Sequence, residues 1–324
     1  MHDFFKTKSK TRTTNLQNHV KRNFGRDYKG VSFKSLETLE ISRQNTKKIL
    51  FIIKLFLIFI GVFISLATYK KDIQFPIFMA VAILNIYIFL KSFVLKHIRS
   101  KFKDEVVVKV IKNINPNLNF FKDDFISKEE FSMSGIFDPF ESKAMYKGND
   151  LIIGNIDEVN FKMSDIELQE VRGSGKSAHI VTIFKGILFI AEFNKFFTSH
   201  TFVVQSAYAN HEGKQIKTDN SEFNKRFNIY TNDTINAFYI LSPSFMERFI
   251  KLNDKFGGSL NAVFFLNRIY IYIDNGKDNF EIDMDMKLTD IVEIFESIKF
   301  EFENFFSIID DLKLNSKIFK TAKM

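Results

Sequence analysis

The chain has 324 residues, which is enough for a membrane segment together with one sizeable soluble domain. It contains no cysteine, and this excludes disulfide bonds, thiolate nucleophiles and cysteine-ligated metal sites. Residues 1–48 hold 12 Lys and Arg against 4 Asp and Glu, so this segment carries the whole net charge of +8 and the remainder is neutral. A basic arm beside a bilayer favours contact with anionic lipid headgroups, whereas no folded basic face indicates nucleic-acid binding.

Four segments follow from the pattern along the chain. Residues 1–34 are rich in Lys, Thr, Asn and Arg, and we expect a disordered basic arm. Residues 35–102 read as a helix that runs into a transmembrane hairpin, and residues 103–147 as a helical connector. Residues 148–324 change to strand-like alternation and form the soluble domain.

Two apolar stretches carry the membrane prediction. Residues 49–69 contain Lys54 as their only charge, and residues 73–95 contain Lys91 as theirs. At 1.5 Å per residue the first stretch reaches about 30 Å, the thickness of the hydrocarbon core. A cleaved signal peptide is a poor alternative, because the first stretch begins late and lacks a small-residue cleavage site.

Most of the basic residues near the hairpin lie before its first span and after its second span. Only Lys70 and Lys71 lie between the spans, so the positive-inside rule predicts a multi-pass protein of the inner membrane with both ends in the cytoplasm. The residues expected to contact lipid headgroups are Lys47, Lys48, Lys96, Arg99 and Lys101.

Asn85 lies near the middle of the second span, where an amide without a partner is costly. Together with Gly61 and Ser65 it predicts helix packing, either within the hairpin or between copies of the chain, so a homo-oligomer remains open. A transport path would need more polar residues than these.

The soluble part predicts an α+β domain, mainly an antiparallel sheet with helices grouped late in the chain. A helix begins at Pro243, and residues 288–312 form a long amphipathic helix. Strands are predicted at 151–156, 159–171, 179–193, 201–205, 227–230, 237–241, 262–266, 269–273 and 280–284, with a turn around Asn194 and a hairpin turn at Asn267 and Arg268.

Motifs for chemistry are weak. Residues 173–177 end like a phosphate-binding loop, but Glu170 replaces the first glycine and a strand follows. No two histidines have metal-ligand spacing, and residues 274–278 read as a polar turn rather than a calcium loop. We therefore predict no catalytic residue, cofactor or metal.

The chain after residue 30 resembles an uncharacterised bacterial membrane family, domain-of-unknown-function family 3137. The resemblance departs at Ser164-Asp165, where members more often carry Ser-Glu. The residues that carry it are Leu36-Glu37-x-Leu39-Glu40-x-x-Arg43, Ile111-x-x-Ile114-x-Pro116, Phe131-x-x-Ser134-x-Ile136-Phe137, Gly154-x-Ile156, Phe161-x-x-Ser164, Phe184-Lys185-Gly186-Ile187-Leu188-Phe189, Phe193-Asn194-Lys195, Glu222-Phe223-x-x-Arg226-Phe227-x-Ile229-Tyr230 and Ile240-Leu241-Ser242-Pro243-Ser244-Phe245-Met246-Glu247. The resemblance implies the architecture and an association with LemA-type membrane proteins, but no activity.

These observations predict a membrane-anchored cytoplasmic module that binds a membrane or cytoplasmic protein, or lipid. The candidate binding residues are Phe184, Lys185, Gly186, Phe189, Phe193, Asn194 and Lys195. Two alternatives stay open. One is a membrane-surface enzyme with a non-contiguous acidic and Lys site, which a pocket around Glu192, Lys195 or Asp283 would favour, and the other is an oligomeric membrane scaffold.

Overall fold

The computed structural model describes residues 28–68, 74–141, 143–205, 212–281, 284, 291–312 and 314. Most of the predicted basic arm, the loop between the two spans, and Asp283 lie outside these residues. The chain forms two compact units. The first contains residues 1–113 and 281–299, and the second contains residues 114–280 and 300–324, so the boundary falls inside the last helix.

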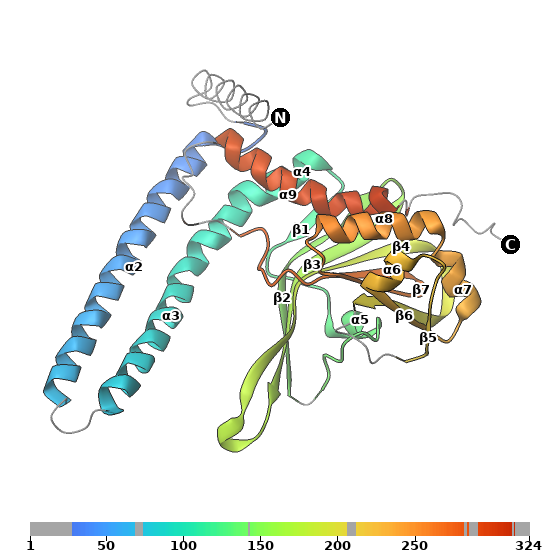
Figure 1. Ribbon diagram of the computed structural model, residues 1–324. Coiled ribbons are helices and arrows are strands. Elements are labelled where there is room, and N and C mark those ends of the chain that lie inside the picture. Colours follow the sequence, from blue (N-terminus) through green and yellow to red (C-terminus); the bar gives the residue numbers. More distant parts are fainter. Residues whose placement is uncertain are drawn as a thin grey trace, which may run out of the picture. The chain divides into compact units, whose positions relative to one another are not determined.

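Two long helices dominate the first unit. Helix α2 spans Phe33–Thr68 and helix α3 spans Gln74–Phe102, and they run side by side (Figure 1). Both are long and apolar enough to cross a membrane. Almost none of their most apolar stretch is buried, whereas a core helix of a soluble protein would be. Gly61 lets the helices approach, since a Cβ there would lie 2.9 Å from Cδ1 of Ile83.

Ion pairs hold the base of this hairpin, and their charged side chains are buried or nearly so except that of Arg99, which is 41% exposed. Arg43 donates to both carboxylate oxygens of Glu40, at 2.9 and 2.7 Å, and to the carbonyl of Met284 at 2.5 Å. Glu281 lies 3.0 Å from Arg99 and 2.6 Å from Lys103. Of the Glu40 and Arg43 of the resemblance, Arg43 therefore attaches the segment after residue 280 to the helices, and Glu40 binds the Arg43 guanidinium.

After α3 the chain continues through a π-helical turn, Lys103–Val107, and helix α4, Val108–Ile114. The second unit is built on a seven-stranded antiparallel sheet with the order β1-β2-β3-β4-β6-β5, and β7 pairs with β4. The strands are β1 Asn119–Phe121, β2 Ala144–Ile156, β3 Val159–Arg172, β4 His179–Gln205, β5 Lys214–Ile216, β6 Phe227–Thr231 and β7 Leu260–Ile273. The helices are α5 Lys128–Ser132, α6 Ser221–Arg226, α7 Thr234–Ile240, α8 Pro243–Lys255 and the second half of α9 Ile291–Leu312.

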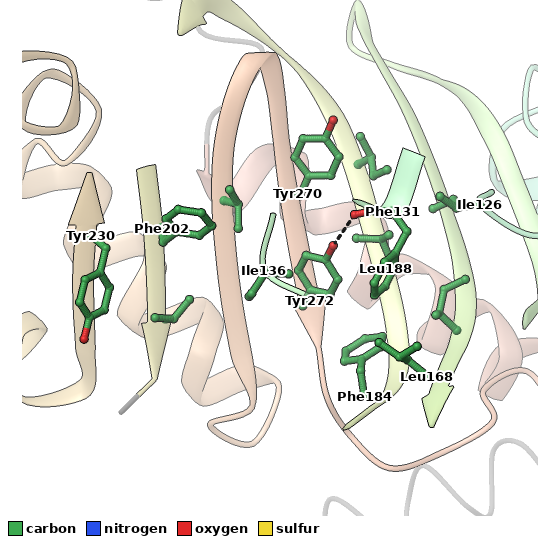
Figure 2. Packing of buried hydrophobic residues seen from close by; sticks show 14 residues of the cluster. Ile126, Phe131, Ile136, Leu168, Phe184, Leu188, Phe202, Tyr230, Tyr270 and Tyr272 are labelled. Carbon is green, nitrogen blue, oxygen red and sulfur yellow. Dashed lines mark hydrogen bonds between the residues drawn. The ribbon is translucent and has the colours of Figure 1, made fainter. Parts of the chain in front are cut away.

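Aromatic side chains fill both faces of this sheet. On one face Phe161 stacks on Phe189 at 5.3 Å and meets Phe306 of α9 at 5.6 Å. On the other face Phe131 of α5 packs edge-on against Tyr272, whose hydroxyl donates to the carbonyl oxygen of Phe131 at 3.4 Å (Figure 2). The same hydroxyl hydrogen-bonds with Ser134 at 2.7 Å. A sheet buried on both faces with its helices grouped late confirms the predicted α+β class.

Four predicted elements are wrong. The described residues of the predicted strand 280–284, namely 280, 281 and 284, are not in a strand. Residues 237–240 belong to helix α7 and Leu241 is its C-cap, instead of a strand, because Asp233 caps the helix by accepting from the backbone N–H of Asn236 at 3.0 Å. The predicted hairpin at Asn267 does not form, since β7 is one strand that pairs with β4 along both halves. Strand β7 instead has a local backbone irregularity at Leu266, where φ is +54°.

Strand β4 also passes Asn194 without the predicted turn. Its pairing with β7 changes register between residues 192 and 197 and again between 197 and 201. The polar residues read as a turn therefore mark a break in pairing within one long strand.

Candidate functional site

A pocket of about 270 Å³ lies in the second unit, on the strands β2, β3 and β4 and beneath the loop that follows β7. Its lining mixes both signs of charge. The lining residues are Lys147, Gly148, Asn149, Asp165, Ile166, Glu167, Lys185, Lys277 and Asp278.

A row of three charges crosses the strands at the pocket. Glu167 of β3 is paired in register with Lys147 of β2 on one side and Lys185 of β4 on the other. Its carboxylate lies 3.4 Å from the Lys147 ammonium and 3.3 Å from the Lys185 ammonium. Directly opposed residues in an antiparallel sheet have adjacent side chains, so the register places both lysines beside one carboxylate.

Asp165 forms the floor of the pocket and is 4% exposed. It accepts a hydrogen bond from the backbone N–H of Asn279 at 3.1 Å and another from the Asn279 side chain at 2.6 Å. Burial raises the pKa of Asp165 well above its usual range, and the nearby carboxylates of Asp278 and Asp150 raise this pKa further against the opposing effect of Asn279. Burial thus shifts the protonation equilibrium of Asp165 toward the neutral acid relative to an exposed aspartate.

The loop after β7 closes the pocket by crossing β4 at Gly186. The backbone N–H of Gly276 donates to the carbonyl of Lys185 at 2.9 Å, and the N–H of Lys185 donates to Asp274 at 3.3 Å. Gly186 has a φ of +154°, and a Cβ there would overlap the carbonyl oxygen of Ile273. Only glycine therefore allows the loop to lie so close to the strand.

Three carboxylates at the pocket could gather around a cation. The oxygens of Asp150, Asp165 and Asp278 lie within 4.8 Å of one another. Carboxylate oxygens are the ligands that calcium and magnesium prefer. However, Asp165 already accepts two hydrogen bonds from Asn279, and Asp278 accepts one from Asn149 at 3.2 Å. Protein donors account for these contacts, and we assign no ion to the cluster.

A second pocket, of about 360 Å³, contains Glu192. There Asn160 donates to Glu192 at 2.8 Å and accepts from Asn155 at 3.0 Å. Of the other residues named for an enzyme site, the side chain of Lys195 and the whole of Asp283 lie outside what the structure describes. Acidic and Lys groups come together around Asp165, and the second pocket also holds Lys162 and Arg268 with Glu192.

The predicted binding residues are divided by the structure. Phe184 and Phe189 are buried on opposite faces of the sheet and belong to the core. Lys185 lines the Asp165 pocket, and Gly186 permits its loop. The side chains of residues 193–195 are outside the described part of the chain.

The residues predicted to pack in the membrane or to contact lipid also lie in different environments. Gly61 packs on α3, Ser65 is partly exposed, and Asn85 is exposed on the side of α3 away from α2. Arg99 pairs with Glu281. The exposed members of the lipid-contact set are Lys47, Lys48, Lys96 and Lys101.

Sequence reasoning missed most of the pocket. Asp165, Glu167, Lys147, Lys277 and Asp278 come from three separate segments and carry no motif. The available signal was the alternation of charged residues with Ile166 and Leu168, which reads equally well as the wet face of a strand.

The class that emerges is an α+β protein with two N-terminal helices capable of crossing a membrane. The family model described as "Protein of unknown function (DUF3137)" matches residues 182–314, which confirms the resemblance to this family. The matched segment includes Lys185, Gly186, Lys277 and Asp278 of the pocket.

No curated protein matches the sequence. Among solved structures, the chain is similar to the crystal structure of the mycobacterial trehalose monomycolate transport factor A, TtfA. The similarity has a TM-score of 0.29 at 6% identity and covers 59% of this chain and 88% of the other. It is too low to carry an argument about function.

Proposed function

We propose that this protein is a membrane-anchored binding module whose sheet domain recognises an anionic group of a protein partner in the Asp165 pocket. The observation that carries the proposal is the set of three lysines at the pocket. Lys147 and Lys185 flank Glu167, and Lys277 lines the same pocket from the loop after β7. Each ammonium group can donate hydrogen bonds to an anionic group of a partner.

Fixed geometry supports binding over a purely solvated surface. Glu167 holds Lys147 and Lys185 on the same row of the sheet, so their ammonium groups remain near the pocket without a ligand. A preorganised site of this kind loses little entropy when it binds. A carboxylate on a partner protein, such as the LemA-type proteins implied by the family resemblance, fits this chemistry.

The two apolar helices support anchoring in a membrane, and we extend this to an inner membrane of a bacterial cell. Basic residues at the outer ends of both helices favour cytoplasmic termini. The test uses single cysteines in the cysteine-free chain. In intact cells a membrane-impermeant maleimide should label Asp72→Cys in the loop between the spans and should leave Lys251→Cys on α8 unlabelled; the reverse pattern would show that the orientation is wrong.

Copurification tests the binding role directly. The tagged full-length chain is recovered from solubilised membranes as wild type, as Lys277→Glu in the pocket, and as Lys251→Glu, an exposed lysine on α8 that serves as the matched control. We expect a protein recovered with the wild type and the control to be lost with Lys277→Glu. If all three variants recover the same proteins, the pocket is not the binding site.

A second candidate, an enzyme at the same pocket, is favoured by the raised pKa of Asp165 beside Lys185. A general acid must carry a proton at the working pH, and burial shifts the pKa of Asp165 in the direction that this role needs. Partner recovery separates the two roles, since Asp165→Asn keeps the size of the side chain and should preserve binding while it abolishes proton transfer.

A further inference from the structure

The amide of Asn85 occupies the middle of the second apolar helix. Its Nδ2 donates to the carbonyl oxygen of Val81, one turn earlier in the same helix, at 2.8 Å. An asparagine side chain has two N–H donors and an oxygen with two lone pairs. Within the part of the chain that the structure describes, the amide bonds only with Val81, which leaves one N–H and the oxygen for a further partner.

Asn85 faces away from the neighbouring helix. Helix α3 meets α2 through the side that carries Ile83, opposite Gly61, whereas Asn85 is exposed. Val81 and Phe89, one turn before and one turn after Asn85, are 55% and 71% exposed on the same side. The hairpin therefore presents a polar group on a surface that would otherwise contact lipid.

Lipid chains cannot supply the missing hydrogen bonds, so the partner must be another protein group at the same depth. We propose that the face of α3 centred on Asn85 pairs with the same face of a second copy of this chain, with the two Asn85 amides hydrogen-bonded across a two-fold axis. This inference rests on the proposed membrane anchoring.

A second copy is favoured over an unrelated helix by two features. An amide carries both donor and acceptor groups, so two of them form a self-complementary pair, as an isologous interface requires. Two copies inserted in the same orientation also place their Asn85 side chains at the same depth in the membrane.

The neighbouring side chains permit a close approach. Ser92 lies two turns after Asn85 on the same side and is exposed. Its hydroxyl donates to the carbonyl of Phe89 at 2.8 Å, so it presents a small side chain with its donor already satisfied. Small and polar residues of this kind are enriched where transmembrane helices pack.

The absence of cysteine allows disulfide trapping at single positions in native membranes. Val81→Cys and Phe89→Cys lie on the proposed interface. Leu84→Cys and Ile86→Cys are matched controls, because they are 58% and 48% exposed but point about 100° to either side of Asn85. We expect a disulfide-linked dimer at the first two positions and several-fold less at the controls.

The amide itself is tested in the Phe89→Cys background. Asn85→Leu should lower the dimer association constant about three- to tenfold, the range expected for one interhelical polar contact. Asn85→Gln retains an amide and should preserve most of the crosslinking. A smaller crosslinked fraction with leucine but not with glutamine would assign the effect to hydrogen bonding and not to shape.

Three results would overturn the proposal. Equal crosslinking at all four positions would mean random collision, an unchanged dimer with Asn85→Leu would remove the amide from the interface, and crosslinking mainly to a different protein would replace the second copy. Membrane fractionation distinguishes a failure of the proposed dimer from a failure of the proposed membrane anchoring. A chain that pellets with membranes but forms no dimer refutes only this inference, whereas a chain in the aqueous fraction refutes both.

Discussion

Replacement of Gly186 by alanine should disrupt the pocket through its closing loop. The backbone there has a φ of +154°, which costs a residue with a side chain about 1–3 kcal/mol. The added Cβ would also overlap the carbonyl oxygen of Ile273 and lie 3.1 Å from the backbone nitrogen of Asn275. Overpacking of this kind costs about 1–3 kcal/mol, and Ile273 is fully buried and cannot move away freely. We expect a total near 4 kcal/mol, or a fall in Tm of roughly 10 °C for a unit of this size.

Gly276→Ala is the matched control for this prediction. Gly276 also has a positive φ, of +67°, but no atom lies within 4 Å of the position of its Cβ. Only the backbone cost of about 1 kcal/mol applies, and the Tm should fall by about 2–4 °C. Near-ultraviolet circular dichroism of the full-length protein in detergent follows the tyrosines, most of which belong to the sheet domain, and avoids the strong far-ultraviolet signal of α2 and α3. If Gly186→Ala and Gly276→Ala unfold within about 3 °C of each other, the close crossing of loop and strand is not present.

Four further changes test other contacts. Burial raises the pKa of Asp165 above its value of 3.8 in the unfolded chain, so the contribution of Asp165 to stability is present below pH 3.8 and is lost as the pH rises through the raised pKa. The urea midpoint should therefore fall less with rising pH in Asp165→Asn than in the wild type. Glu130→Gln weakens two partly exposed ion pairs and should cost about 1 kcal/mol in urea unfolding, less in high salt. Arg43→Met leaves the carboxylate of Glu40 buried and should cost about 3 kcal/mol or more, with partial recovery when Glu40→Leu is added, as measured by resistance to trypsin in detergent. Phe184→Ala should cost about 3–5 kcal/mol of unfolding free energy because its ring is buried, while an exposed docking residue would cost little.

The elements that the sequence predicted well are those with long, consistent patterns. The two apolar helices and the amphipathic helix ending at Leu312 follow from composition and helical spacing over many residues. Helix α7 was mistaken for a strand because Ala237–Leu241 is rich in apolar and aromatic residues. The N-cap at Asp233 favours the helix in the structure. In the sequence a short polar residue such as Asp233 is equally compatible with a turn or a loop, so it does not predict the helix.

The sequence predicts turns inside two long strands for a related reason. Asn194 and Asn267 are typical turn residues, and each stands between two apolar runs. In the fold they lie in β4 and β7, which pair with each other and change register between Glu192 and Phe197. An irregularity shared by two partner strands depends on their pairing, and no pattern within either strand reveals it.

The pocket depends on the same tertiary information. Lys147, Glu167 and Lys185 are far apart in sequence and become one row only when the register of β2, β3 and β4 is known. A shift of one residue would send Glu167 to the opposite face of the sheet and separate it from both lysines. Gly186 helps to fix this arrangement, because the loop that carries Lys277 and Asp278 can cross β4 only where a side chain is absent. The position of Lys277 and Asp278 in the pocket therefore depends on the glycine that admits their loop, and Gly186→Ala should displace both side chains from the pocket.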